Sequence, residues 1–391
     1  MRMPPFFRNF AMRKPPATAR PLHRKKMKMK ESACSFKEVR TASTPSPRTV
    51  LKWPTGLFLL SFLLLGCGRS TPPKPTPRPH LTTEIMLKTT PVKDQGRSEL
   101  CWVYAMLATI ETEHLTQGDS VNLSPDYIAR LYLTQQARSH YLGHGRTAIT
   151  LRGTAPMLLR LVQTYGLVPY DSYPEREPRA NCNVLCRQLE QASRHAPDLH
   201  RLQRRADDLL DQGLGVMPAA RVYMLGASYT PLEFAHSVCR TDEYEALTSF
   251  THHPFGRRFA LEVPDNRMGD LCLNLPLDTL VSRVDRSLRH GHPVCWEGDI
   301  SNDGFSFASG TARVDPRLHV GQALRQRLFE RRQTTDDHCM ALVGIVRTRK
   351  GHKLYVAKNS WGTGNAFGGF VYMNENYLRQ NTICVVMKRS N

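Results

Sequence analysis

An apolar segment that begins at Cys101 places the strongest constraint on the fold of this chain. From Cys101 to Leu115 the sequence reads CWVYAMLATIETEHL, with apolar side chains at helical spacing. We expect Glu111 and Glu113 to lie outside the apolar face. That face consists of Val103, Met106, Leu107, Ile110 and Leu115. A helix that starts at Cys101 directs backbone N–H groups and the positive end of its dipole at the sulfur, and both favour the thiolate over the thiol.

A second pattern, near the end of the sequence, predicts a β-hairpin. His338 precedes an apolar run over residues 340–346, a charged turn follows at Lys350, and a second apolar run over residues 354–357 ends before Asn359. The two strands are expected to bring His338 and Asn359 to the same end of the hairpin. A nucleophilic cysteine needs a base, and the base needs a group that orients it.

The charge of the chain does not indicate a nucleic-acid-binding protein. The chain has 391 residues, 40% of them hydrophobic, and a formal net charge of +20. Residues 1–66 hold 14 Lys and Arg against 2 Asp and Glu, so +12 of the charge lies there. The basic excess is mostly an N-terminal extension, and the remainder is long enough for one large core or two lobes. We expect no nucleic-acid partner.

The basic extension ends in a segment typical of export signals. Residues 57–65 are uncharged and almost all apolar, about the length of a signal-peptide core and too short to span a bilayer. The sequence Leu64-Leu65-Gly66-Cys67 resembles the lipobox of bacterial lipoproteins, in which the cysteine is acylated and becomes the mature N-terminus. The resemblance implies a lipid anchor at Cys67 in the bacterial cell envelope, on the periplasmic or outer-membrane face. The alternative is a buried helix with an incidental cysteine.

The chain is thus expected to have three parts. Residues 1–66 form the leader and signal peptide, residues 67–87 a Pro-rich linker, and residues 88–391 the folded domain. Prolines favour an extended, semi-rigid linker, which would hold the domain away from a membrane surface.

The ten cysteines do not define a disulfide pattern. Besides Cys34, Cys67 and Cys101, seven remain, so at least one thiol stays free. Export makes some disulfides plausible. Cys182 and Cys186 are expected to form either a bridge or two buried core thiols.

The Cys101 segment resembles the papain-like cysteine peptidases. In that family a glutamine lies six residues before a Cys-Trp pair, as Gln95 does before Cys101 and Trp102. The resemblance implies that Cys101 is the nucleophile and that Gln95 and the Cys101 N–H stabilise the oxyanion.

The hairpin resembles the same family through the sequence KNSWG at residues 358–362. This implies that His338 is the base, that Asn359 orients it, and that Trp361 covers their hydrogen bond. Trp102 and Trp361 are expected to shield the substrate site.

The loop before Cys101 departs from the family pattern. Ser98 stands where the family usually has a cysteine, so the disulfide that braces this loop in many relatives is not expected. Glu99 replaces a small residue, and we expect its side chain to point to solvent because a carboxylate beside the sulfur would oppose ionisation.

The spacing of the motifs resembles one branch of this family. Cys101 and His338 lie 237 residues apart, against roughly 130 to 150 in compact papain enzymes. The bleomycin hydrolase and aminopeptidase C branch has a comparable insertion and similar sequences around residues 123–133, 165–175 and 275–301. The insertion, residues 182–244, is expected to be helical, amphipathic and basic. Its basic face either contacts anionic lipid or an acidic substrate, or is simply solvated.

Two groups of histidines hint at a metal site but do not complete a ligand pattern. They are His252-His253, and His290 with His292 near Cys295. We therefore predict no metal and no cofactor.

The resemblance implies a two-lobed α+β papain-like fold, a helical lobe plus a β-rich lobe with a large helical insertion. It implies a membrane-tethered cysteine peptidase that cleaves a peptide or protein substrate through a thioester. The alternatives are a catalytically silent peptide-binding lipoprotein and acyl transfer other than hydrolysis. No oligomeric state is predicted.

Two further expectations concern access to the cleft. In the bleomycin hydrolase branch a C-terminal tail enters the cleft, whereas only residues 388–391 follow the last apolar run here. We expect an open cleft that accepts internal bonds or blocked peptides, unless residues 182–244 close it. Residues 68–90 leave little room for an inhibitory propeptide, so activity is expected without proteolytic maturation.

Overall fold

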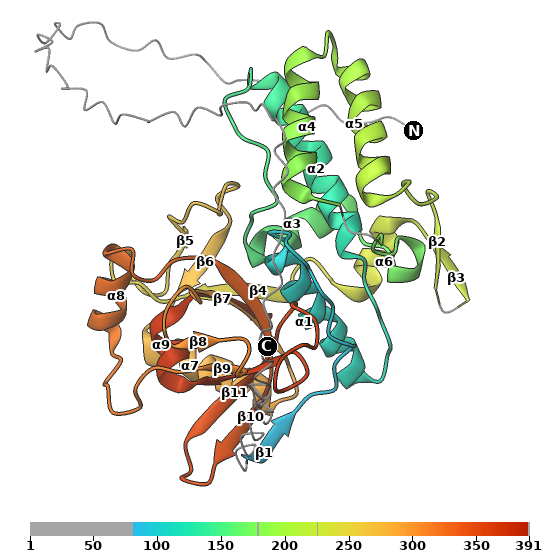
Figure 1. The fold of residues 1–391 in the computed structure, drawn as a ribbon. Coiled ribbons are helices and arrows are strands. Elements are labelled where there is room, and N and C mark those ends of the chain that lie inside the picture. Colours follow the sequence, from blue (N-terminus) through green and yellow to red (C-terminus); the bar gives the residue numbers. More distant parts are fainter. Residues whose placement is uncertain (1–80, 178–179, 225, 390–391) are drawn as a thin grey trace, which may run out of the picture. The chain divides into compact units, whose positions relative to one another are not determined.

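The computed structural model describes residues 81–177, 180–224 and 226–389, which form a mixed β-sheet and a group of helices beside it (Figure 1). The leader, the lipobox at Cys67 and most of the predicted linker lie outside the described residues. Longer helices gather on one side and most strands on the other (Figure 1). The predicted α+β fold is confirmed.

The main sheet holds the predicted hairpin at its centre. Its strands are β1 (Leu81–Met86), β4 (Tyr244–Thr248), β5 (Arg258–Ala260), β6 (Leu271–Asn274), β7 (Val294–Gly298), β8 (Phe305–Ser306), β9 (Thr311–Ala312), β10 (His338–Thr348), β11 (Lys353–Lys358), β12 (Phe370–Asn374) and β13 (Thr382–Lys388). They run in the order β5-β6-β4-β13-β7-β10-β11-β12-β9-β8, and β1 pairs with β10 outside this path. Strands β10 and β11 are antiparallel, with Ala341 opposite Lys358, so His338 and Asn359 lie at one end as predicted.

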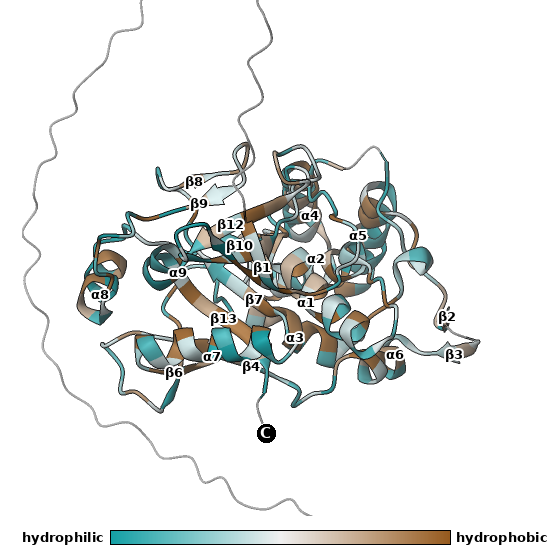
Figure 2. Ribbon diagram, turned by 90° about the horizontal axis from the view of Figure 1, so that it is seen from below, coloured by the Kyte–Doolittle hydropathy of each residue, from teal (hydrophilic) through white to brown (hydrophobic). Residues whose placement is uncertain are grey.

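Helices cover both faces of this sheet. They are α1 (Cys101–Gln117), α2 (Pro125–Leu142), α3 (Ala155–Tyr165), α4 (Cys182–His195), α5 (Leu199–Leu214), α6 (Pro231–Val238), α7 (Leu277–Arg289), α8 (Gln322–Glu330) and α9 (Glu375–Asn381), with a short 3₁₀ turn at Tyr170–Ser172. Helix α1 packs against β10 and β7 on one side and contacts α2 and α3 on the other. Helix α7 packs its apolar residues Leu280, Val284 and Leu288 into a second cluster of buried hydrophobic residues. Figure 2 shows β13, in the same sheet, as mostly hydrophobic.

Helix α1 begins at Cys101 as predicted, but its environment differs from the prediction. Every residue from Trp102 to Glu113 is buried, including Glu111 and Glu113. The expectation that these two carboxylates lie outside the buried face is wrong, because α1 is enclosed on several sides rather than along one face. Glu111 accepts hydrogen bonds from Lys93 Nζ at 2.6 Å and the Leu123 N–H at 2.8 Å.

Glu113 is neutralised in the same way. It accepts from Lys388 Nζ at 2.7 Å and lies 3.0 Å from His292 Nδ1. A buried carboxylate is tolerated only with such partners.

The insertion is mainly helical, as predicted. Helices α4 and α5 pack side by side on α2, and α6 follows a small hairpin of β2 (Val222–Met224) and β3 (Ala227–Tyr229). Both α4 and α5 bury one apolar face. On α5, Asp207 and Asp211 pair with Arg130 of α2, at 3.7 Å and 2.7 Å. Acidic side chains of α5 therefore hold this helix to the domain.

None of the eight cysteines of the described residues forms a disulfide. Of the two alternatives for Cys182 and Cys186, the bridge is not formed, and Cys186 is buried in the core. Within the part of the chain that the structure describes, none of the helices is long and apolar enough to cross a membrane.

The partners of Glu111 give a prediction about stability. Glu111→Ala would leave the Lys93 ammonium and the Leu123 N–H without their acceptor in a buried place. We expect the free energy of unfolding to fall by about 3 kcal/mol, measured by urea denaturation. Glu177→Ala, at an exposed position, is the control and should change it by less than about 0.5 kcal/mol. Equal stability of the two variants would contradict the role of Glu111.

Candidate active site

Cys101 lies half-buried at the N-terminal end of α1. Among the described residues, no side chain caps this helix end. The pKa of the Cys101 thiol is held well below its usual range, chiefly because the Cys339 thiol donates a hydrogen bond to the Cys101 sulfur. Burial opposes this shift, and a hydrogen bond and charge from His338 reinforce it. The arrangement therefore favours a thiolate.

His338 is held by the side chain of Asn359. The distance from His338 Nε2 to Asn359 Oδ1 is 2.7 Å, and both residues are buried. Asn359 Oδ1 also accepts from the Ser360 N–H at 2.8 Å, which identifies it as the oxygen. His338 Nε2 is therefore the donor, and its other ring nitrogen is left for Cys101.

Trp361 lies over this pair, where the sequence predicts it. The ring centroids of Trp361 and His338 are 4.7 Å apart. Phe305 and Phe307 pack edge-on against Trp361. Trp361 thus contacts the imidazole and is itself held by two phenylalanine rings.

Gln95 is fixed by two serines. Its Oε1 accepts from Ser360 Oγ at 2.6 Å, and its Nε2 donates to the Ser98 carbonyl at 2.7 Å. Ser98, which replaces a cysteine of the family pattern, also donates its hydroxyl to the Gln95 carbonyl at 2.7 Å. One hydrogen of Nε2 remains for another acceptor. Gln95 lines the same cavity as Cys101 and His338.

Trp102 does not line this cavity, unlike Trp361. It is fully buried, and its indole N–H donates to the Leu151 carbonyl at 2.8 Å. A Cβ on Gly153, a residue that does line the cavity, would lie 2.8 Å from the Trp102 ring. The expected shielding by Trp102 is therefore indirect: it supports the loop that forms a wall.

The cavity around Cys101 has a volume of about 180 Å³. Glu99 forms part of its wall and accepts from Thr150 Oγ1 at 3.1 Å, so it does not point away to solvent as expected. This hydrogen bond holds the carboxylate against the opposite loop. The insertion at residues 182–244 contributes no described residue to the cavity wall.

The sequence did not identify three residues of this site. Ser360 fixes Gln95, Cys339 contacts the Cys101 sulfur, and Glu297 forms part of the cavity wall. Only Ser360 had a signal, because it lies inside the KNSWG segment.

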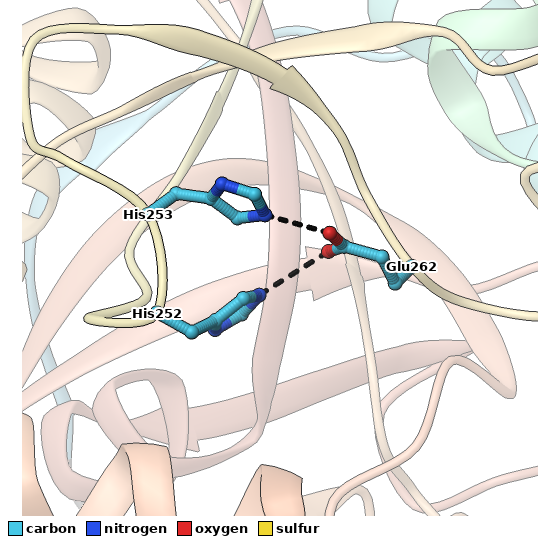
Figure 3. Close-up of side chains that lie close together, drawn as sticks. All are labelled: His252, His253 and Glu262. Atoms are coloured by element: carbon cyan, nitrogen blue, oxygen red, sulfur yellow. Dashed lines mark hydrogen bonds and ion pairs between the residues drawn. The ribbon is translucent and has the colours of Figure 1, made fainter.

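A cluster outside this site is a candidate for metal binding. Ligand atoms of His252, His253 and Glu262 lie within 4.8 Å of one another, and Figure 3 shows both rings directed at the carboxylate. The distances from the two Nε2 atoms to Glu262 are 3.2 Å and 2.6 Å. The ligand types suit zinc.

The surroundings of His252 do not favour a metal. The Gln326 oxygen accepts from the Thr251 N–H at 2.7 Å, so its amide nitrogen faces His252 Nδ1, at 3.0 Å, and donates to it. The ring proton therefore lies on Nε2. A metal on Nε2 would move this proton to Nδ1, against the Gln326 N–H group. The absence of a resident metal stays a prediction.

The second histidine group, His290 and His292 near Cys295, does not form a common metal site. His292 pairs with Glu113, and His290 Nδ1 bonds to the Arg286 carbonyl at 2.7 Å. Cys295 is fully buried in the core.

Comparisons with known proteins point to one class. Residues 220–391 match the Peptidase C1-like family. Aminopeptidase E of Lactobacillus helveticus is 25% identical over 181 residues, which cover 43% of this chain and 41% of that protein. Mitochondrial cysteine proteinase 1 of Saccharomyces cerevisiae strain JAY291 is 22% identical over 371 residues, covering 78% of this chain and 76% of that protein. The chain thus spans less than half of the first relative and about three quarters of the second.

The fold agrees with these matches. The crystal structure of PepW from Lactobacillus rhamnosis HN001 superposes with a TM-score of 0.61 at 19% identity, covering 79% of this chain and 82% of that one. The predicted papain-like fold is confirmed. Residues 220–391, less than half of the chain, are thus similar to the C1 peptidases, and the chain has a papain-like fold. The matched family and the two relatives carry peptidase names, an aminopeptidase and a cysteine proteinase.

The contacts of Cys101 predict its reactivity. An ordinary thiol ionises near about pH 8.5. Alkylation of Cys101 by iodoacetamide should follow an ionisation below that of an ordinary thiol. Cys339→Ala should move this ionisation upward, because it removes the donor with the largest effect on the Cys101 pKa. Peptide mapping by mass spectrometry gives the rate at Cys101 as a function of pH.

Cys182, a half-buried thiol outside the site, is the internal reference. Its profile should not change in the Cys339→Ala variant. Identical Cys101 profiles in wild type and variant would show that Cys339 does not act on the sulfur.

Proposed function

We propose that this protein is a cysteine peptidase that hydrolyses peptide bonds with Cys101 as nucleophile. One observation carries the proposal: a thiol of lowered pKa at a helix N-terminus lies beside His338, which is itself bonded to the buried Asn359. A nucleophile, a base and an orienting group in this order are the parts that acyl transfer from an amide requires.

The chemistry follows from these positions. The Cys101 thiolate attacks the carbonyl carbon of the substrate, and the negative charge that develops on the oxygen is stabilised by the Cys101 N–H and the remaining Nε2 hydrogen of Gln95. His338, which holds the proton of the Cys101 thiol on its other ring nitrogen, gives this proton to the leaving amine as the C–N bond breaks, which leaves a thioester. Water, deprotonated by His338, then attacks the thioester and releases the acid, and Cys101 regains its initial state.

Asn359 acts through His338. Its Oδ1 accepts a hydrogen bond from the Nε2–H of His338 and so directs the other ring nitrogen toward Cys101. Trp361 and its neighbours limit access of water to this bond, which strengthens it.

We also propose that the protein is anchored to a bacterial membrane by a lipid on Cys67. Support comes from the lipobox-like sequence alone, and Cys67 lies outside the described residues. The Pro-rich segment that follows would place the peptidase domain at a distance from the membrane.

A catalytically silent peptide-binding protein is the alternative function. Both functions need the cavity, and only the peptidase needs a reactive Cys101. Turnover of a fluorogenic peptide that is lost in Cys101→Ala separates them.

Four substitutions test the assigned roles in peptide hydrolysis. Cys101→Ser and His338→Ala should abolish turnover, because they remove the nucleophile and the base. Gln95→Ala should lower kcat about a hundredfold, corresponding to roughly 3 kcal/mol of oxyanion stabilisation. Asn359→Ala should lower it less, because it only orients His338.

Initial rates with a fluorogenic peptide give kcat and KM for each variant. Because Gln95 acts on the transition state, its KM should stay close to that of the wild type. Wild-type kcat in Gln95→Ala would refute the oxyanion role while leaving the nucleophile assignment intact.

The anchor is tested by metabolic labelling with a fatty-acid analogue in a bacterial host. Wild type should carry the label and partition into detergent, and Cys67→Ala should lose both properties. Cys34→Ala, which lies upstream of the lipobox, is the matched control and should keep the label. Labelling that persists in Cys67→Ala would contradict the anchor.

A further inference from the structure

The cavity beside Cys101 is lined by many more acidic than basic side chains. Its wall contains five carboxyl groups and one guanidinium, that of Arg152. The acidic residues are Glu99, Asp265, Glu297, Asp336 and Asp337. Within the described part of the chain, no second Lys or Arg contributes to this wall.

The single arginine is already paired. Arg152 Nε lies 2.8 Å from Asp265 Oδ1 and 3.0 Å from Oδ2. Asp337 accepts from the Ile300 N–H at 2.8 Å, a neutral donor. Glu99 likewise has a neutral donor in Thr150. Among the described residues, the other four carboxyl groups of the wall form no ion pair, and Arg152 and His338 act on Asp336 and Asp337 only through their charge.

Glu297 is the most deeply buried of these acids, with only 2% of its surface exposed. One oxygen, Oε2, accepts from the Ala155 N–H at 2.9 Å at the start of α3 and from the Cys384 thiol at 3.5 Å. The structure records no hydrogen-bond partner for Oε1 among the described residues. The side chain thus brings an oxygen with no recorded hydrogen bond to the cavity next to the nucleophile.

Asp336 lies on the same wall and is 7% exposed. Its Oδ2 has only a long hydrogen bond, 3.4 Å from the Asp265 N–H. Burial, with a contribution from the charge of Asp336, raises the pKa of Glu297 to about 8. Burial and Asp265 raise the pKa of Asp336 to about 6. At neutral pH Glu297 therefore keeps its proton. Asp336, on which the charge of Arg152 acts in the opposite direction, is mostly ionised but takes up a proton more readily than an ordinary aspartate.

We propose that this cavity binds a cationic group of the substrate, an ammonium or a guanidinium, through Glu297 and Asp336. The inference rests on the proposed function, because it assigns the substrate class of the same site. A positive charge placed there would supply the partner that Oε1 of Glu297 lacks, and it would favour the ionised form of both acids. Substrates are then selected by a positive charge close to the bond that is cleaved.

Two parts of a peptide carry this chemistry: a lysine or arginine side chain, and the free α-amine of the N-terminus. The cavity adjoins the nucleophile, so either group would lie within one or two residues of the cleaved bond. The experiment distinguishes these sources.

The first measurement does not require catalysis. Cys101 is labelled with two thiol reagents of similar size, a cationic 2-aminoethyl and an anionic 2-sulfonatoethyl methanethiosulfonate, and the ratio of the two rates is taken. The same thiolate attacks the sulfur of both reagents and expels methanesulfinate, so a change in the Cys101 pKa cancels in the ratio. Wild type should prefer the cation at least tenfold.

The combined variant Glu297→Gln with Asp336→Asn should reduce this ratio at least tenfold. Glutamine keeps a carbonyl oxygen as acceptor for the Ala155 N–H, so the fold should be retained, and a thermal melt checks this. Glu330→Gln is the matched control, because Glu330 lines a neighbouring cavity and not the one at Cys101. The control should keep the wild-type ratio.

The second measurement uses fluorogenic peptides with lysine or its neutral isostere norleucine at either of the two residues before the cleaved bond. Each peptide is made with a free and an acetylated N-terminus. A preference for lysine in the acetylated pair identifies the side chain, and a preference for the free amine identifies the terminus. The combined variant should lose at least tenfold in kcat/KM for the preferred peptide only.

The outcomes separate the two proposals. Equal labelling of wild-type Cys101 by the cationic and anionic reagents would overturn the cation site, whether or not peptides are cleaved. Cation-selective labelling without any peptide cleavage would overturn the peptidase and leave the cation site standing. Cleavage with no preference for a positive charge would leave the peptidase and overturn the substrate class.

Discussion

The burial of α1 is the constraint on which the rest of the site depends. Its residues from Trp102 to Glu113 are enclosed between the sheet and the neighbouring helices, so the position of the first residue, Cys101, is fixed by packing along the whole helix. A helix end is also where N–H groups lack intrahelical partners. The enclosed helix therefore supplies both a rigid support for the sulfur and the donors that favour its negative charge.

The same burial creates a need for compensating charges, and these connect the helix to the hairpin. Glu111 of α1 is paired with Lys93 and accepts a hydrogen bond from Thr90, which in turn accepts from Lys358 Nζ at 2.8 Å. Lys358 is buried, which lowers its pKa to about 8, and it directly precedes Asn359. A polar network behind the site thus ties the element that carries the thiol to the element that carries Asn359.

The local sequence pattern was sufficient to predict the helices and strands. It was not sufficient to predict the hydrogen bonds that connect them. The helix start at Cys101 and the hairpin that joins His338 to Asn359 follow from periodicity and turn residues, which act over a few positions. Glu111 was misplaced because a helical wheel represents one buried face, and α1 has several. Glu297 could not be assigned from sequence, because its partner, the Ala155 N–H, lies 142 residues away and exists only once α3 is docked. The expectation that Glu99 points to solvent was wrong for a similar reason, since its hydrogen-bond donor, Thr150, comes from a distant loop.

Glu111 and Glu297 are both buried acids, and they differ in how many of their carboxylate oxygens have partners within the fold. Glu111 has a lysine, a hydroxyl and a backbone N–H for its oxygens, so its charge is compensated inside the fold. Glu297 has recorded donors on one oxygen only, and burial raises its pKa to about 8. An uncompensated buried carboxyl destabilises a fold, and a hydrophobic residue at that position would avoid the cost. The proposed cation site gives a reason for a carboxyl of this kind beside Cys101, because its missing partner would come from the substrate. The interaction that does not stabilise the folded state would then stabilise the complex with the substrate.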